Sequence, residues 1–384
     1  MMLRTLFLIA ASAALLTAQR ATQFENRDAL AVENDKVELL IFPKGGAFAS
    51  LTLKDDVAKM NAMWNPYAGA RAANQPARFG DSTGHFLCVD GFGGTSKEEA
   101  AAGFQGHGEA HRLDWEKTSA GREGNGTQVS FRVTLPKVQE VLTRKVSLLD
   151  GEQVIAVDSE LESLLAFDRP VNWAEHATIG SPFLSPGVTV VDASVGRCQT
   201  RPRETPTGRR PDGNRLVGAQ EFTYPNAPTK AGGTTNLRAV PAEPNSMDHT
   251  GCAFDPARKH VFVTAIRKDK GLVFGYLLRR EEYPWLQEWM NYTHPQNLAR
   301  GLEFGTQPYD LPRRVVVDMN NLFGVPTYRW LPAKSKISTR FLMFYAHAPA
   351  GFEQVDDVRL EAGKLILVDR KSGKQVELKT NQIL

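Results

Sequence analysis

The sequence predicts an all-β protein, built as one large antiparallel β-sandwich, and three observations lead to this fold class. Apolar and polar residues alternate with a period of two in many short segments, which is typical of strands with one buried face. Turn residues such as the pair Asp150-Gly151 separate these segments. Beyond the first residues, no long stretch shows the 3.6-residue apolar repeat of an amphipathic helix. We expect about 15 to 20 strands in this all-β pattern.

The clearest strands occur in five places. The segment "TRKVSLLDGEQVIAVDSELES" (143–163) is expected to form a hairpin that turns at Asp150-Gly151. The segments 259–266 and 271–278 form a second pair, joined by a short charged turn. The other three places are "VSFRVTL" at 129–135, "STRFLMFYAHA" at 338–348, and a C-terminal hairpin at 363–379 that turns at Ser372-Gly373.

Two kinds of segment depart from this strand pattern. Residues 96–102 and 280–290 are candidates for short helices. Residues 199–247 are rich in Pro, Gly, Arg, Thr and Asn and show little apolar alternation. This segment is either a long surface excursion or a loop that walls one side of a binding cleft, and its composition allows both.

The first residues have the layout of a secretory signal peptide. An arginine near the start precedes an apolar run from Leu6 to Leu16, and small residues end at Ala18. The run is shorter than the roughly 18–20 residues that span a bilayer, so no stable membrane span is expected. We therefore expect a signal peptide at 1–18, export to the periplasm or the extracellular space, and one domain at 19–384.

The composition is that of an ordinary soluble protein, with 42% hydrophobic and 23% charged residues. The formal net charge is only +3, and no basic run is interleaved with aromatic residues, which argues against a nucleic-acid partner. Cys88, Cys198 and Cys252 are too few for a disulfide framework and lack the close spacing of a zinc site. One disulfide at most can form, and the sequence leaves its pairing open.

The segment "GFQGHGEAHRLDWE" (103–116) carries His107 and His111, four residues apart. On a helix this spacing would place both imidazoles on one face and favour a metal ion. Three glycines in the same stretch argue against a helix, so no metal site is expected. The glycines beside His107 indicate instead a turn whose backbone closely approaches either a ligand or neighbouring chain.

Two acidic residues lie in otherwise apolar surroundings. In "NWAEHATIGSPFL" (172–184), Glu175 precedes His176, which is either a core histidine with satisfied hydrogen bonds or one that faces a pocket. Glu303, in "ARGLEFGTQPYD" (299–310), either points from a strand into solvent or lies in a partly buried site. In a buried site, desolvation would raise the pKa of the carboxyl toward that of a general base.

Aromatic residues gather in "YPWLQEWMNY" (283–292), which contains Trp285 and Trp289. Such rings suit the apolar faces of sugars, and ordinary core packing is the alternative for each of them. In "NSMDHTGCAF" (245–254), Asp248 and His249 precede an apparent strand, where an aspartate usually caps the backbone of a turn.

Taken in order along the chain, these segments resemble landmarks of the galactose mutarotase-like (aldose 1-epimerase) superfamily, whose fold is a large antiparallel β supersandwich. The opening hairpin of that family is similar to "VELLIFPKGGAFASLTLKDD" (37–56). The other similar segments are "GHGEAHRLDW" (106–115), "WAEHATIGSPFL" (173–184), "MDHTGCAF" (247–254) and "GLEFGTQP" (301–308). The Asn-Arg stretch of aldose epimerases is missing, and "ARFGDSTGHFLCVDGFGG" (77–94) stands in its place.

The resemblance implies interconversion of sugar anomers by general acid/base ring opening, a reaction that needs no cofactor. It implies that Glu303 is the base and His176 the acid, and a histidine suits this role because its usual pKa is about 6.5. It further implies a set of sugar-binding residues: His107, Asp248, Gln307, Arg78 in place of the missing arginine, and Trp173, Trp285 and Trp289 as stacking surfaces.

Two other functions are compatible with the same fold, because a fold does not determine a function. The first is a carbohydrate-binding protein without catalysis. The second is a polysaccharide-processing enzyme, and a glycoside hydrolase needs two carboxylates about 5 to 10 Å apart across the cleft. Asp248 and Glu303 are the candidates for that pair. In all three cases the expected partner is a sugar or an oligosaccharide.

Overall fold

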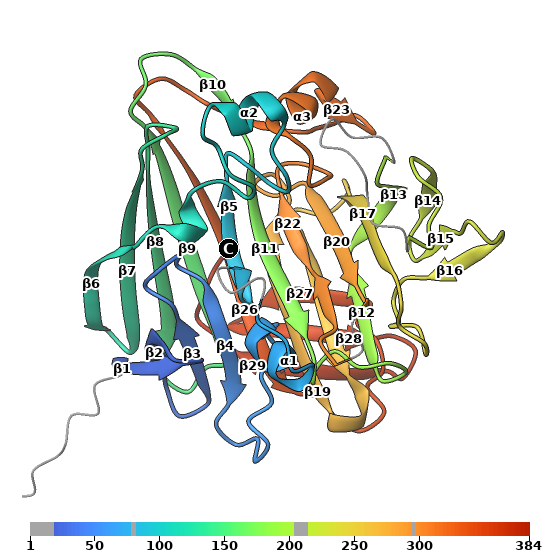
Figure 1. Cartoon of the computed structure of the whole chain (residues 1–384). Coiled ribbons are helices and arrows are strands. Elements are labelled where there is room, and N and C mark those ends of the chain that lie inside the picture. Colours follow the sequence, from blue (N-terminus) through green and yellow to red (C-terminus); the bar gives the residue numbers. More distant parts are fainter. Residues whose placement is uncertain (1–18, 78–81, 203–213, 294–295) are drawn as a thin grey trace, which may run out of the picture.

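The structure is a computed structural model that describes residues 19–77, 82–202, 214–293 and 296–384 (Figure 1). The predicted signal peptide and Arg78 lie outside these ranges. The chain is mostly β, with antiparallel strand pairs throughout its two large sheets, which confirms the predicted fold class.

The first large sheet has twelve strands and carries the residues discussed below. Its order is β1 (Gln19–Phe24), β2 (Arg27–Glu33), β3 (Val37–Ile41), β4 (Phe48–Leu53), β5 (His85–Val89), β11 (Trp173–Gly180), β21 (Ala299–Gly301), β20 (Trp285–Asn291), β17 (Met247–Phe254), β13 (Val195–Thr200) and β14 (Glu221–Thr223), with β22 (Glu303–Gly305) paired to both β11 and β20.

The second large sheet has eight strands, in the order β12 (Thr189–Ala193), β18 (His260–Arg267), β19 (Leu272–Arg279), β26 (Lys336–His347), β9 (Val154–Ser163), β8 (Glu140–Leu149), β7 (Gly126–Leu135) and β6 (Glu116–Glu123). It contains the predicted hairpin at 143–163 and the predicted pair at 259–278, both of which are confirmed. A single-turn 3-10 segment, Lys268–Lys270, joins the second pair.

A third sheet covers the outer face of the eight-stranded sheet. It consists of β27 (Asp357–Glu361), β28 (Lys364–Asp369) and β29 (Lys374–Lys379), drawn in red in Figure 1. On β26, Tyr345 joins the core between the two large sheets, whereas its neighbour Phe344 packs toward the third sheet. Because both faces of the second half of this strand are buried, residues 341–346 are continuously apolar instead of alternating.

The remaining elements are short. Three two-stranded ribbons form from β10 (Arg169–Val171) with β25 (Arg329–Leu331), β15 (Asn226–Pro228) with β16 (Thr234–Asn236), and β23 (Asn321–Leu322) with β24 (Val325–Pro326). The helices are α1 (Pro66–Ala72), α2 (Lys97–Ala101) and α3 (Arg313–Met319), with a 3-10 turn at Ala110–Arg112. None of the helices in the described ranges is long and apolar enough to cross a membrane.

Three expectations about local structure had different outcomes. A helix near 96–102 is confirmed by α2, whose N-terminus is closed by a capping box between Ser96 and Glu99. The helix expected at 280–290 was wrong, because this stretch contains β20, which pairs with β17 along its whole length. The described residues form 29 strands, more than the expected 15 to 20. The excess arises because many of these strands are only two or three residues long.

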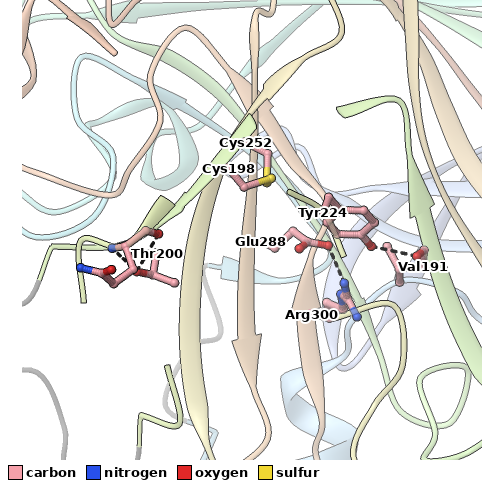
Figure 2. The surroundings of a disulfide bond; sticks show 8 residues. Val191, Cys198, Thr200, Tyr224, Cys252, Glu288 and Arg300 are labelled. Atoms are coloured by element: carbon pink, nitrogen blue, oxygen red, sulfur yellow. Dashed lines mark hydrogen bonds and ion pairs between the residues drawn. A yellow bond between two sulfur atoms is a disulfide. The ribbon is translucent and has the colours of Figure 1, made fainter. Parts of the chain in front are cut away.

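A disulfide joins two neighbouring strands of the first sheet. Cys198 on β13 and Cys252 on β17 are paired, as Figure 2 shows, and Cys88 is a buried free thiol. Close to this bond, the buried Arg300 guanidinium donates to the Glu288 carboxylate. The disulfide therefore ties β13, the neighbour of the edge strand β14, to β17, a strand that contributes two residues to the pocket described next.

Candidate active site

The histidine and the glutamate singled out by the sequence meet on adjacent strands. In the β11–β22 pairing, Glu175 is opposite Phe304, and continuing this register by one residue places His176 opposite Glu303. The Nδ1 atom of His176 lies 3.2 Å from Oε1 of Glu303 and 2.9 Å from Oγ1 of Thr178. Strand β5 pairs with the other edge of β11, and there the His176 ring stacks on Phe86 with 4.2 Å between the ring centroids.

Glu175 points to the opposite face of β11, as the alternation of side chains along a strand requires. Its carboxylate lies in the core between the sheets, 2.6 Å from Nη2 of Arg144 and 2.9 Å from Nε2 of His85. Burial acts to raise the pKa of Glu175, but the Arg144 charge and the hydrogen bond from His85 outweigh it and lower the pKa to about 2. Glu175 is thus a structural anion, and His176 faces a pocket.

That pocket has a volume of about 250 Å³ and opens on the first sheet. Cross-strand pairs build one wall, because His249 of β17 is opposite Trp289 of β20, and Met247 is opposite Asn291. The complete lining is Trp64, Ser82, Phe86, Phe92, His107, His176, Met247, His249, Trp289, Asn291, Glu303 and Asp310.

The backbone at His107 explains the glycines that surround it. His107 itself has a φ of 65°, a left-handed conformation that is uncommon for a residue with a side chain. A Cβ atom at Gly108 would lie 2.1 Å from the carbonyl oxygen of Val89, so this turn packs directly on β5. The close approach is therefore to neighbouring chain, and it directs the His107 ring into the pocket.

The hydrogen bonds of His107 fix its tautomer. The backbone N–H of Gly93 donates to Nδ1 over 3.3 Å, so in the neutral ring the proton resides on Nε2. Burial lowers the pKa of His107 to about 4, which keeps the ring neutral near pH 7. His107 therefore offers a neutral N–H donor, and its ring centroid is 5.2 Å from that of His176. Within the described ranges, no three His, Cys, Asp or Glu side chains are grouped as metal ligands.

Burial favours the neutral form of both central groups. It raises the pKa of Glu303 well above 4.5, and the charge of Asp310 adds to this effect. It lowers the pKa of His176 well below 6.5, and the neighbouring His107 acts in the same direction. Both shifts favour the form of the pair in which Glu303 carries the proton and His176 is neutral. Among the described residues, no well-aligned hydrogen bond reaches Oε1 of Glu303, although this atom lies 3.2 Å from Nδ1 of His176.

Of the nine residues that the sequence and the resemblance proposed, four line the pocket: Glu303, His176, His107 and Trp289. Asp248 is not among them, because the alternation of β17 directs it away from His249. Its carboxylate accepts hydrogen bonds from the Arg215 backbone N–H at 2.8 Å and Nε at 2.6 Å. Asp248 thus anchors the segment after residue 213.

Three further residues also lie outside the pocket lining. The Trp173 indole faces the core and donates to Glu175 over 3.2 Å. Trp285 is fully buried and donates to the carbonyl oxygen of Pro326 over 2.7 Å. Gln307 is buried as well, and its amide donates to the Tyr309 carbonyl over 2.8 Å. Arg78, the last of the nine, belongs to the residues that the structure does not describe.

The structure adds pocket residues that the sequence analysis missed. His249 could have been predicted from the sequence. Side chains alternate along β17, which places Met247 and His249 on one face and Asp248 on the other. Asp310 gave no such signal. It is brought to the pocket by the chain that follows β22, where it forms an ion pair of 2.5 Å with Nε of Arg201 and lies 3.6 Å from Nε2 of His249.

Comparisons with known proteins agree with this geometry at the level of the fold. No protein-family model and no curated protein matches the chain. Solved structures do match, although their sequences are only 10% to 13% identical. The chain has the galactose mutarotase-like fold.

Three of these structures illustrate the likeness. A candidate aldose 1-epimerase from Klebsiella pneumoniae aligns with a TM-score of 0.59 at 11% identity, over 86% of this chain and 83% of its own. A galactose mutarotase-like protein from Clostridium acetobutylicum has a TM-score of 0.58 at 13% identity, over 86% and 99%. A galactose mutarotase related enzyme from Lactobacillus acidophilus has a TM-score of 0.57 at 12% identity, over 86% and 100%. The galactose mutarotase-like fold thus accounts for most of the chain.

Proposed function

We propose that this protein binds a free aldose in the pocket and interconverts its α and β anomers. The observation that carries the proposal is the contact of 3.2 Å between His176 and Glu303, two groups of different basicity in a buried site. Such a pair can remove one proton and supply another without exchange with bulk water.

In the proposed reaction, the member of the pair that lacks the proton takes the hydrogen of the anomeric hydroxyl. The other member protonates the ring oxygen as the bond between that oxygen and C1 breaks, which leaves an open-chain aldehyde. Rotation about the C1–C2 bond presents the other face of the carbonyl group. Ring closure reverses both proton transfers, so the pair is restored and no cofactor is consumed.

The rest of the pocket supplies the contacts that a sugar needs. Its volume of about 250 Å³ lies below the roughly 300–1,000 Å³ of sites for drug-sized ligands, so it suits a single sugar ring. His107 is a donor at Nε2, and the oxygens of Asp310 and Asn291 are acceptors for hydroxyl groups. Trp289 and Trp64, edge to face with 5.8 Å between centroids, provide an apolar wall.

The two alternative functions receive different support. A glycoside hydrolase that uses Asp248 and Glu303 is not supported, because Arg215 holds Asp248 away from the pocket. A binding protein without catalysis remains compatible with the same contacts. Activity, and not the fold, separates this alternative from the isomerase.

We further propose that the protein is exported, as the signal-peptide pattern at 1–18 indicates. The Cys198–Cys252 disulfide supports this proposal, since disulfides persist mainly in oxidising compartments. Sequencing the N-terminus of the secreted protein should give Gln19 as the first residue. An intact Met1 on protein recovered from the cytoplasm would contradict export.

Polarimetry tests the enzymatic proposal. We expect wild-type protein to speed the relaxation of α-D-glucose or α-D-galactose, and Glu303→Gln to lower kcat by about 10²–10⁴-fold, the usual contribution of a general acid or base. Glu361→Gln, an exposed glutamate on the third sheet, is the matched control and should retain full activity. If wild-type protein accelerates neither sugar while sugars still raise its unfolding temperature, the protein is a binder and the isomerase proposal fails.

A further inference from the structure

A second hollow, with a volume of about 670 Å³, lies away from the candidate active site. It is formed by the turn between β19 and β20 and by the chain that follows α3. In Figure 1, α3 and β23 lie together at one end of the molecule. The lining of this hollow includes Arg280, Glu281, Glu282, Asn320, Tyr328, Arg329 and Trp330. The two hollows share no lining residue.

An exposed aromatic pair forms one side of this hollow. The side chain of Trp330 is 56% exposed, whereas tryptophan is normally largely buried. Its ring meets that of Tyr328 edge to face, with 5.7 Å between centroids and an interplanar angle of 84°. The backbone of Trp330 is held by its pairing with Pro170 of β10, so the indole is presented to solvent from a fixed strand.

The rest of the lining combines apolar residues, Pro284, Val325 and Pro326, with polar ones, among which both signs of charge occur. Two guanidinium groups, on Arg280 and Arg329, accompany two carboxylates, on Glu281 and Glu282. Each arginine is oriented by donating to a backbone carbonyl, Arg280 to Arg258 over 3.0 Å and Arg329 to Ser338 over 3.2 Å. Since neither sign of charge dominates, the hollow favours an uncharged ligand rich in hydrogen-bonding groups.

The chain that forms the hollow is anchored to the core beneath it. Trp285 donates to the carbonyl oxygen of Pro326, and Phe323 packs on the Trp285 ring at 6.2 Å between centroids. The hydroxyl of the buried Thr327 donates to the carbonyl oxygen of Val316 over 2.7 Å. The position of the aromatic pair is therefore set before any ligand arrives, which reduces the entropy lost on binding.

We propose that this hollow binds a neutral oligosaccharide. The apolar face of a pyranose ring stacks on the Trp330 indole, and the hydroxyl groups of neighbouring rings bond to the arginine, glutamate and asparagine side chains. The site requires neither the acid/base pair nor the pocket around it, so it is independent of the proposed isomerase activity. Its role is to hold the protein on a polymer of sugars.

Isothermal titration calorimetry tests the proposal with linear neutral hexasaccharides of gluco, galacto, manno and xylo configuration and with a galacturonic acid hexasaccharide. We expect at least one neutral chain to bind, and Trp330→Ala to weaken it by about tenfold or more, the loss typical of a central tryptophan contact. Phe167→Ala removes a 60% exposed aromatic outside the hollow and should leave affinity unchanged. Glu303→Gln should also leave it unchanged, which separates this site from the active site.

Three results would overturn the proposal. The first is that no neutral hexasaccharide binds, or that only the acidic one does. The second is equal affinity of wild type and Trp330→Ala, with both shown to be folded by circular dichroism. The third is a dimer in solution that Trp330→Ala converts to a monomer, because the aromatic pair would then be an interface between two copies of the chain.

Discussion

The carboxyl group of Glu303 folds back over the α-carbon of Gly301, so closely that a Cβ atom at position 301 would lie 2.3 Å from Oε1. This contact depends on the absence of a side chain, because Gly301 has an ordinary strand conformation. It fixes the direction of the carboxyl group relative to His176, and it identifies Gly301 as a positioning residue for the proposed reaction.

The first prediction follows from this contact. Gly301→Ala should displace the Glu303 carboxyl and lower kcat by about 10- to 100-fold, because a shift of about 1 Å at a catalytic group can cost about 10². Gly121→Ala is the matched control, since a Cβ atom there meets nothing within 4 Å. Polarimetric kcat values for both variants provide the measurement. Full activity in a folded Gly301→Ala protein would show that the carboxyl position is unimportant.

The second prediction concerns the pH dependence of activity. Lowering the pH adds a second proton to the pair and removes its base, and raising the pH takes away its last proton and removes its acid. We therefore expect kcat/KM to be bell-shaped, with an acid midpoint below 6.5 because burial lowers the pKa of His176 below that value. The residual activity of Glu303→Gln should lack the alkaline limb. An acid midpoint at or above 6.5 would contradict the assignment of that limb to His176.

The third prediction links Glu303 to stability. Its pKa is raised in the folded protein, so the folded state binds more protons than the unfolded state above pH 4.5 and loses stability as the pH rises. Glu303→Gln keeps the neutral form at every pH. We expect it to unfold a few degrees higher than wild type at pH 8 and at nearly the same temperature at pH 4. Calorimetric scans at both pH values decide this, and a lower unfolding temperature at pH 8 argues against it.

The fourth prediction concerns the buried anion on the other face of β11. Glu175→Gln leaves the Arg144 charge without its partner in the core, which should reduce the free energy of unfolding by about 3–5 kcal/mol at pH 7. Because the folded pKa of Glu175 is lowered to about 2, its contribution is present above the ordinary glutamate pKa of 4.5 and is lost as the pH falls toward 2. Urea unfolding at pH 7 and pH 3 measures both effects.

The double variant Arg144→Met with Glu175→Gln is the control for this prediction. Removing both charges should recover part of the stability lost by Glu175→Gln alone. Equal stability of wild type and Glu175→Gln at pH 7 would mean that the ion pair contributes nothing to the fold.

The fifth prediction separates two tryptophans of β20. Trp289→Ala should raise KM for the sugar with little effect on folding, because Trp289 lines the pocket and is not fully buried. Trp285→Ala should instead lower the free energy of unfolding by about 3–5 kcal/mol, as for other buried aromatic residues. KM and urea unfolding of both variants are the measurements. A raised KM in a stable Trp285→Ala protein would instead indicate that Trp285 contacts the sugar.

Much of the fold could be predicted because strand periodicity and turn residues are local properties of a chain. The Asp150-Gly151 and Ser372-Gly373 hairpins form where the sequence indicated. The helix predicted at 280–290 was wrong. The strand conformation there depends on β17, which lies far away in sequence and supplies its hydrogen bonds. Continuously apolar strands such as β26 alternate little, since they are covered on both faces by segments that their own sequence does not reveal.

The sequence by itself determined the residue types of the site and the rule that neighbours on a strand face opposite ways. It therefore predicts that Glu175 and His176 face opposite sides of the sheet, and the same rule applies to Asp248 and His249. Only the tertiary structure decided which member of each pair faces the pocket, because this depends on which side of the sheet the second sheet covers. It alone also brought Asp310 to His249 and left Trp285 and Gln307 in the core. The physical reason is that burial and pairing are set by contacts between distant segments, which no local pattern encodes.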